Sequence, residues 1–263
     1  MVKSAVPSYS NRGEIEFRHV SFRYPDAEEA ILTDINFTVH RGETVAFIGS
    51  SGSGKSTLIN LVPRFYDVTE GEICIDGINI KEYTQEALHR KLGYVSQRAV
   101  MFRGSVLSNV TYGENGCQSV DEELLWKSIE IAQADDFVQG MENGYHTAVA
   151  QGGTNLSGGQ KQRLAIARAI YCRPEIYIFD DSFSALDYKT DRVLRKMLKQ
   201  ETGTATTLIV AQRIGTIMDA DKIIVLDEGK IVGIGRHKEL LKSCPVYREI
   251  AESQLSKEEL ESA

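Results

Sequence analysis

The chain has 263 residues, of which 42% are hydrophobic and 25% charged, and a formal net charge of −7. This composition is typical of an α/β protein with a large core, and the acidic balance argues against non-specific nucleic-acid binding, which uses basic surfaces. The sequence contains no run of about 18 apolar residues that would predict a membrane-spanning helix. The four cysteines are scattered without a CxxC pair, which favours reduced thiols over metal ligands.

The first 48 residues predict a linker followed by three strands. Residues 1–13 are polar and are interpreted as a linker, and residues 14–24 alternate between apolar and polar side chains as a strand does. Residues 35–39 predict a second strand. The run at 44–48 is short, apolar and rich in β-branched residues, which is typical of a buried parallel strand.

A glycine-rich loop of the form G-x-x-x-x-G-K-[ST] follows that buried strand and precedes a helix predicted over residues 56–65. Its glycines allow backbone N–H groups to point at phosphate oxygens. Lys55 would place its charge at the β- and γ-phosphates, and the Ser56 hydroxyl would bind Mg²⁺. The predicted nucleotide-binding residues are Gly49, Ser50, Ser51, Gly52, Ser53, Gly54, Lys55, Ser56 and Thr57.

The middle of the chain predicts a strand at residues 72–75, a tight turn, and then a mostly helical insertion from about residue 84 to 153. A helix is predicted over residues 157–169. Its start, with Ser157 as N-cap and two glycines in the first turn, is an anion site where a phosphate held by another subunit could lie. This candidate site comprises Leu156, Ser157, Gly158, Gly159 and Gln160.

Strands and helices alternate in the last third of the chain. A buried strand at residues 176–179 ends at Asp180, which would hold Mg²⁺ through its waters. A helix at 190–200, a strand at 207–210 and a hairpin at 222–234 follow, and residues 255–263 form a charged tail. This alternation predicts a parallel α/β sheet.

These motifs, in this order, resemble the nucleotide-binding domain of an ABC transporter over residues 14–254. The resemblance implies ATP and Mg²⁺ as cofactors. It also implies a P-loop NTPase core with a parallel sheet, an N-terminal antiparallel β-subdomain and a helical subdomain, at about residues 84–172, that contains the signature. By the same resemblance, Tyr24 would stack on adenine, and Gln97 would reach Mg²⁺ and the attacking water. The D-loop that crosses the dimer interface would be Ser184, Ala185, Leu186 and Asp187.

Two segments are similar to the exporter branch of this family, in which both face the coupling helices of the membrane domain. They are residues 101–106 with Asn109 and 112–113, and residues 151–153 just before the signature. The resemblance therefore implies an exporter's transmembrane domain as a partner, and a location at the cytoplasmic face of the cell membrane.

The sequence departs from the family pattern at two catalytic positions. Asp181 stands where the family has a glutamate general base, and Gln212 stands where it has the switch histidine. An aspartate is one methylene shorter and reaches the lytic water less easily, and positioning by a general base is worth roughly two to four powers of ten in rate. Glutamine loses the charge and proton-shuttling ability of histidine. Together these changes indicate a site that binds ATP and hydrolyses it slowly.

In this family two domains pair head to tail, so each ATP contacts the P-loop of one chain and the signature of the other. This chain therefore resembles the degenerate-site half of heterodimeric bacterial multidrug exporters, with a different chain supplying the catalytic Glu and His. Three alternatives stay open: a homodimer with two slow sites, a soluble non-transport ABC ATPase, and a regulatory ATP-binding module without turnover.

Overall fold

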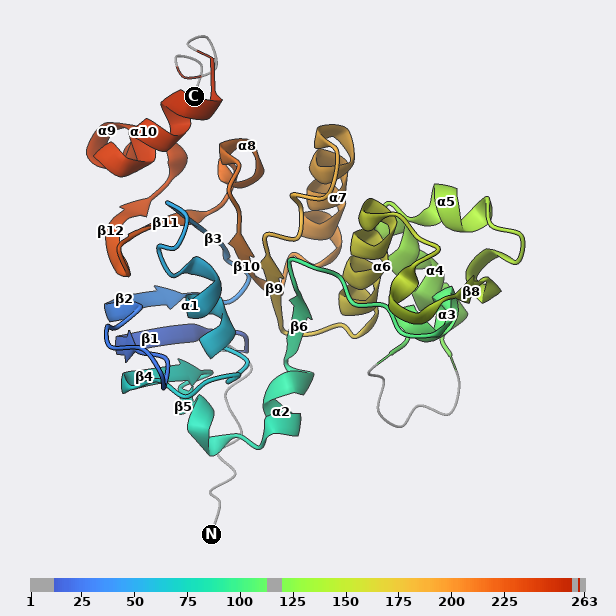
Figure 1. Cartoon of the computed structure of the whole chain (residues 1–263), viewed down its shortest axis with the longest axis horizontal. Coiled ribbons are helices and arrows are strands. Elements are labelled where there is room, and N and C mark those ends of the chain that lie inside the picture. The colour runs from blue at the N-terminus through green and yellow to red at the C-terminus, as the bar shows by residue number, and fades with distance from the viewer. Residues whose placement is uncertain (1–11, 113–119, 257–259, 261–263) are drawn as a thin grey trace.

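A six-stranded sheet forms the centre of the protein, whose computed structural model describes residues 12–112, 120–256 and 260 (Figure 1). The strand order is β12–β11–β3–β10–β9–β6, with all neighbours parallel except β11 and β12. The strands are β3 (Thr44–Gly49), β6 (Leu92–Val95), β9 (Ile176–Asp180), β10 (Thr206–Val210), β11 (Lys222–Asp227) and β12 (Lys230–Gly235).

A second, antiparallel sheet shares a hydrophobic core with the central one and lies beside it in Figure 1. Its order is β2–β1–β4–β5, and its strands are β1 (Ile15–Phe22), β2 (Leu32–Val39), β4 (Glu70–Ile75) and β5 (Ile78–Asn79). The Phe37 ring stacks on Phe17 within this sheet and contacts Phe47 of β3, with ring centroids 4.4 Å and 5.7 Å apart. The two sheets are therefore joined by aromatic packing.

Two hydrophobic cores lie on opposite faces of the central sheet because side chains alternate along each strand. In β9, Ile176 and Ile178 belong to the core shared with the antiparallel sheet, whereas Tyr177 and Phe179 belong to the core on the other face. The first core packs on α1 (Lys55–Leu61) and α2 (Gln85–Arg90).

The second core extends into a helical region that projects from the sheet in Figure 1. The helices of that region are α3 (Val106–Val110), α4 (Glu122–Ile131), α5 (Asp135–Gln139) and α6 (Gly158–Tyr171), with the short strands β7 (Gly104–Ser105) and β8 (Ala148–Val149) beside them. The remaining helices are α7 (Tyr188–Glu201), α8 (Ile214–Ile217), α9 (His237–Ser243) and α10 (Pro245–Gln254). In the ranges described, every helix is too short or too polar to cross a membrane.

The predicted fold class is confirmed, and the predicted hairpin is β11 and β12. Its turn has positive φ at both Glu228 and Gly229, the backbone of a type I′ turn. The mostly helical segment predicted from about residue 84 to 153 also contains a strand, because residues 92–95 form the edge strand β6 of the central sheet. The predicted helix over 56–65 ends earlier, at Leu61, because the chain turns at Arg64 with φ of 57°.

Some predicted features lie outside the described residues. They are Gly113 of the exporter-like segment, Cys117, residues 1–11 of the linker, and residues 257–259 and 261–263 of the tail.

Candidate functional site

The glycine-rich loop joins the end of β3 to the start of α1, as the sequence predicts. Glycine is required by close backbone packing at Gly49, and it is favoured by side-chain packing and conformation at Gly54. A Cβ atom at Gly49 would lie 1.9 Å from the Leu226 carbonyl oxygen of β11, and one at Gly54 would lie 2.7 Å from a methyl carbon of Leu32. Gly54 also has φ of +97°, a conformation that favours glycine, and it directly precedes the helix.

The Lys55 ammonium group lies folded over this loop. Its Nζ donates to the carbonyl oxygens of Gly49 and Ser50 at 3.0 and 2.7 Å, and to Ser53 Oγ at 3.1 Å. Burial lowers the pKa of Lys55, and the charges of Asp181 and Asp180 oppose that shift. All three hydrogen-bond acceptors are neutral, so phosphate oxygens would be stronger partners for this ammonium group.

Asp180, the last residue of β9, meets the first turn of α1. Ser56 Oγ donates to Asp180 Oδ1 at 2.8 Å, and the Tyr94 hydroxyl of β6 lies 3.4 Å from Oδ2. Burial raises the pKa of this carboxyl, and the hydrogen bonds from Ser56 and Tyr94 lower it. A hydroxyl and a carboxylate side by side are the oxygen ligands that Mg²⁺ prefers, so these residues fit a magnesium ion.

Asp181, Gln97 and Gln212 form one hydrogen-bonded network, although they come from three separate segments. Asp181 Oδ2 accepts from Gln97 Nε2 at 3.1 Å and from Gln212 Nε2 at 2.9 Å. Asp181 has φ of 47°, which aspartate tolerates better than most residues. Burial, and then the charge of Asp180, raise the pKa of Asp181. The side-chain amides of both glutamines therefore donate to the same oxygen of Asp181, the carboxylate that would have to orient water.

Replacement of Asp181 by Asn is expected to stabilise the protein at neutral pH. Because the folded-state pKa lies above the ordinary value, the ionised carboxyl costs stability at neutral pH, and that cost disappears as the pH falls through the folded pKa. An asparagine Oδ1 can still accept from both glutamines. Each pKa unit corresponds to about 1.4 kcal/mol, and about 1 kcal/mol raises the Tm of a chain of this size by roughly 2–4 °C.

Thermal unfolding at pH 7.5 and at decreasing pH tests this expectation, with Asp26→Asn at an exposed position as the control. If Asp181→Asn does not raise the Tm at pH 7.5, or if the gain in Tm grows as the pH falls, the ionised Asp181 carboxyl does not cost stability as proposed.

An open cleft of about 660 Å³ connects these groups. Its walls include loop residues Gly49, Ser51, Gly52, Gly54, Lys55, Ser56 and Thr57, together with Tyr24, Gln97, Asp181 and Gln212. The half-buried Tyr24 packs edge-on against Tyr66, and its hydroxyl lies 3.1 Å from Thr57 Oγ1. The cleft therefore brings together an aromatic ring, a phosphate-type loop and the candidate catalytic residues.

Helix α10 forms part of this cleft, and sequence reasoning misses it. Ile250, Ser253 and Gln254 line the cleft. Gln254 Oε1 accepts from the Ile214 amide and its Nε2 donates to the Gln212 carbonyl, both at 2.8 Å. One side chain thus binds the backbone at both ends of residues 212–214, which we call the switch segment. Its partners are 40 and 42 residues away along the chain, so no local pattern could have indicated the contact.

The signature residues lie apart from this cleft, because none of Leu156–Gln160 lines it. Ser157 caps α6 through a reciprocal pair with Gln160, in which Ser157 Oγ accepts from the Gln160 amide at 3.2 Å. Ser157 and Gly158 are exposed, and a Cβ atom on Gly158 would meet nothing within 4 Å. Packing within this chain therefore does not explain the glycine at that position.

The predicted D-loop lies between the signature and the switch segment. A Cβ atom on Gly159 would lie 3.5 Å from the Ala185 carbonyl, and Asp187 caps α7 by accepting from the Thr190 amide at 3.0 Å. Arg213 donates to the carbonyl oxygens of Ser184 and Leu186 at 3.2 and 3.4 Å. The residue after Gln212 is thus tied directly to the D-loop.

The chain is similar to proteins that are more than twice its length. It is 48% identical over 94% of its length to an uncharacterised ABC transporter ATP-binding protein of Mycobacterium bovis, and 45% identical over 94% to a Staphylococcus aureus protein named as a candidate multidrug export ATP-binding/permease protein. The chain spans 42% of each of these relatives.

A solved structure of a bacterial Atm1-family ABC exporter with ATP bound superposes with a TM-score of 0.89 at 37% identity, covering 97% of this chain and 44% of that one. A family model described as ABC transporter matches residues 32–184, more than half of the chain. The likeness to a solved exporter agrees with this match, and so does the presence of a glycine-rich loop and of a buried strand that ends at two carboxylates. The chain therefore belongs to the ABC transporter family.

Proposed function

We propose that this chain is the ATP-binding domain of an ABC exporter and that it binds MgATP in the cleft around the glycine-rich loop. In this proposal Tyr24 stacks on the base, and Lys55 and the loop amides hold the phosphates. Ser56, Asp180 and Gln97 would bind Mg²⁺, which would neutralise part of the phosphate charge when present. The exporter relatives and the shared fold support this function.

The hydrogen bonds of Asp181 are the observation that supports slow hydrolysis in this cleft. A carboxylate that orients water needs an acceptor oxygen directed at that water. Here Oδ2 is held by the amides of Gln97 and Gln212, and the side chain is one methylene shorter than glutamate. Gln212 can donate a hydrogen bond to the γ-phosphate but cannot carry the positive charge of a protonated histidine. ATP would therefore remain bound through several cycles.

The exposed signature supports head-to-tail pairing with a second nucleotide-binding domain. Ser157 and Gly158 are exposed at the positive end of helix α6, and they lie outside this chain's own cleft. They would complete a partner site whose own chain supplies the catalytic Glu and His. The slow site would then act by biasing the pair toward closure, which couples the two sites energetically.

An exposed aromatic pair supports docking of a transmembrane domain in the exporter-like segment. The rings of Phe102 and Tyr112 stack with centroids 4.3 Å apart and are 38% and 55% exposed. The Arg168 guanidinium lies 5.5 and 5.8 Å from the two ring centroids. Exposed aromatic side chains of this kind are enriched at protein interfaces. We place this surface against the membrane domain, at the cytoplasmic face of the membrane.

ATP binding and steady-state phosphate release by the purified chain test the proposal together. We expect saturable MgATP binding with negligible turnover. Rapid turnover that rises with the square of the protein concentration would instead support a homodimer with two working sites, and no binding of ATP would overturn the assignment of the cleft.

Ser157→Arg is expected to leave ATP binding by this chain within about two-fold of the unchanged protein, because the signature lies outside the cleft and the change is at an exposed N-cap. Ser157→Thr, which keeps the capping hydroxyl, is the matched control for helix stability. Titration with a fluorescent ATP analogue measures both variants. A loss of affinity confined to the arginine variant would place the signature at this chain's own nucleotide.

A further inference from the structure

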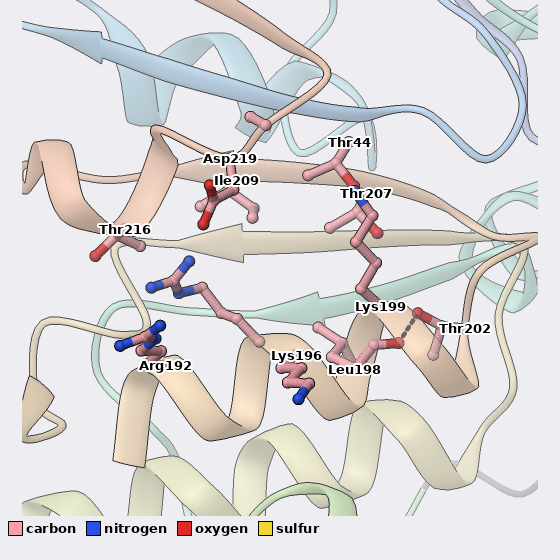
Figure 2. Close-up of a pocket in the computed structure, with 12 residues that line it drawn as sticks. Thr44, Arg192, Lys196, Leu198, Lys199, Thr202, Thr207, Ile209, Thr216 and Asp219 are labelled. Carbon is pink, nitrogen blue, oxygen red and sulfur yellow. Dashed lines mark hydrogen bonds between the residues drawn. The ribbon is translucent and has the colours of Figure 1, made fainter. Parts of the chain in front are cut away.

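A second cavity, of about 380 Å³, lies between helix α7 and the face of the central sheet formed by β3 and β10 (Figure 2). It shares no lining residue with the nucleotide cleft. Its volume is at the lower end of the range of small-molecule sites, roughly 300–1,000 Å³. The proposed ATP function does not use this cavity.

One wall of the cavity is cationic, because α7 places basic residues at helical spacing along it: Arg192, Arg195, Lys196 and Lys199. Arg195 is paired with Asp191, with Nε 2.7 Å from Oδ1. Lys199 has only a loose partner, since its Nζ lies 3.9 Å from Asp221 Oδ1. Neither Arg192 nor Lys196 has an ion pair within residues 12–112 and 120–256. Asp219 is the acidic lining residue, so positive charge is in excess.

The floor of the cavity offers hydroxyl groups on neighbouring strands. Thr44 of β3 and Thr207 of β10 are register partners, so both side chains point to the same face of the sheet. Thr207 is only 6% exposed, and in the part of the chain that the structure describes its hydroxyl makes no hydrogen bond. In Figure 2 the Lys199 side chain extends from α7 across the cavity in the direction of Thr207.

The rest of the lining is apolar and comes from Leu198, Ile209 and Ala220, each of which is buried. A cationic group and hydroxyl donors are the partners that a carboxylate or phosphate takes in proteins. Apolar side chains favour a short hydrocarbon body, because contact with them removes its surface from water. The lining is therefore complementary to a molecule with an anionic head and an apolar body.

We propose that this cavity binds a small organic anion, with its phosphate or carboxylate head at Lys199 and Thr207 and its apolar body against Leu198 and Ile209. The site adjoins α7, which begins directly after Asp187 of the D-loop, and includes Thr216 of α8, which follows the switch segment. It is independent of the nucleotide cleft in its residues and in the ligand it takes.

Titration calorimetry with octyl phosphate as the probe tests the site, at fixed ionic strength and in the presence of saturating ATP. We expect saturable binding that ATP does not displace, and at least about ten-fold weaker binding of inorganic phosphate or octanol, each of which lacks one half of the probe. The proposal would be overturned if ATP displaced octyl phosphate, or if inorganic phosphate or octanol bound as tightly as octyl phosphate.

Lys199→Ala is expected to weaken octyl phosphate binding about ten-fold, because it removes the charged group that would bind the phosphate head. Thr207→Val keeps the side-chain volume and should weaken binding several-fold. Lys238→Ala, which removes the same charge from an exposed position on α9, is the control and should leave binding unchanged. ATP binding is measured on each variant. Equal effects of the variants at 199 and 238 with ATP binding retained would refute this site without touching the proposed nucleotide function.

Discussion

Replacing Lys55 with alanine is expected to weaken MgATP binding by roughly 100-fold or more, because at least one charge-assisted hydrogen bond to phosphate is lost, worth up to about 3 kcal/mol. The Lys55 ammonium group also donates to carbonyl and hydroxyl oxygens of the loop itself. The variant therefore removes both a phosphate partner and hydrogen bonds that hold the loop. Equilibrium titration with MgATP measures the loss.

The matched control is Lys81→Ala, at an exposed position in the β-subdomain far along the sequence from the loop. Because Lys55 also holds Gly49 and Ser50, the thermal stability of each variant is measured alongside binding. Unchanged ATP affinity in a folded Lys55→Ala protein would remove the glycine-rich loop from the proposed nucleotide site.

Restoring the family residues, with Asp181→Glu and Gln212→His together, is expected to raise phosphate release by roughly 100-fold, the lower end of the effect of general-base positioning. The double variant adds the missing methylene to the carboxylate and removes the Gln212 amide that binds it at 2.9 Å. In the proposed head-to-tail pairing, Ser157 and Gly158 of each copy would complete the site of the other, so two copies of the double variant would form two complete sites. Turnover measured as a function of protein concentration should therefore show dimerisation.

Adding Ser157→Arg to the double variant separates this mechanism from contamination or non-specific hydrolysis. Turnover should return to the level of the unchanged chain, while ATP binding persists, because the arginine would disrupt the signature that each copy contributes to the other in the proposed pair. If the double variant shows no gain at any protein concentration, residues 181 and 212 are not what limits hydrolysis.

The position of the glycine-rich loop and the parallel core were predictable because their signals are local. The run Thr44–Gly49 is apolar and leads directly into a motif with fixed glycine positions, and β9 and β10 are continuous buried runs. Strand β6 has a weaker signal. It contains only four residues, two of them half-buried, and Gly93 at its second position is unusual in a strand.

The arrangement of the candidate catalytic residues could not be predicted from spacing. Gln97 and Asp181 are separated by 84 residues, and Gln212 and Asp181 by 31. The motifs indicate that these residues belong to one site, but not that both amides bind the same carboxylate oxygen. That contact depends on β6 and β9 being neighbours in the sheet and on the backbone turn at Asp181, features that arise only when the whole sheet has assembled.

The nucleotide cleft draws its walls from Tyr24 near the start of the described chain and from Gln254 near its end. A site assembled over such a span exists only when both ends are in place, so ATP would bind the complete fold and not a partly unfolded form. Mass action then gives about 2.7 kcal/mol of added stability when free ATP is 100 times its Kd. Cellular ATP would thus stabilise the folded domain against unfolding, and a domain that hydrolyses ATP slowly would keep this added stability longest.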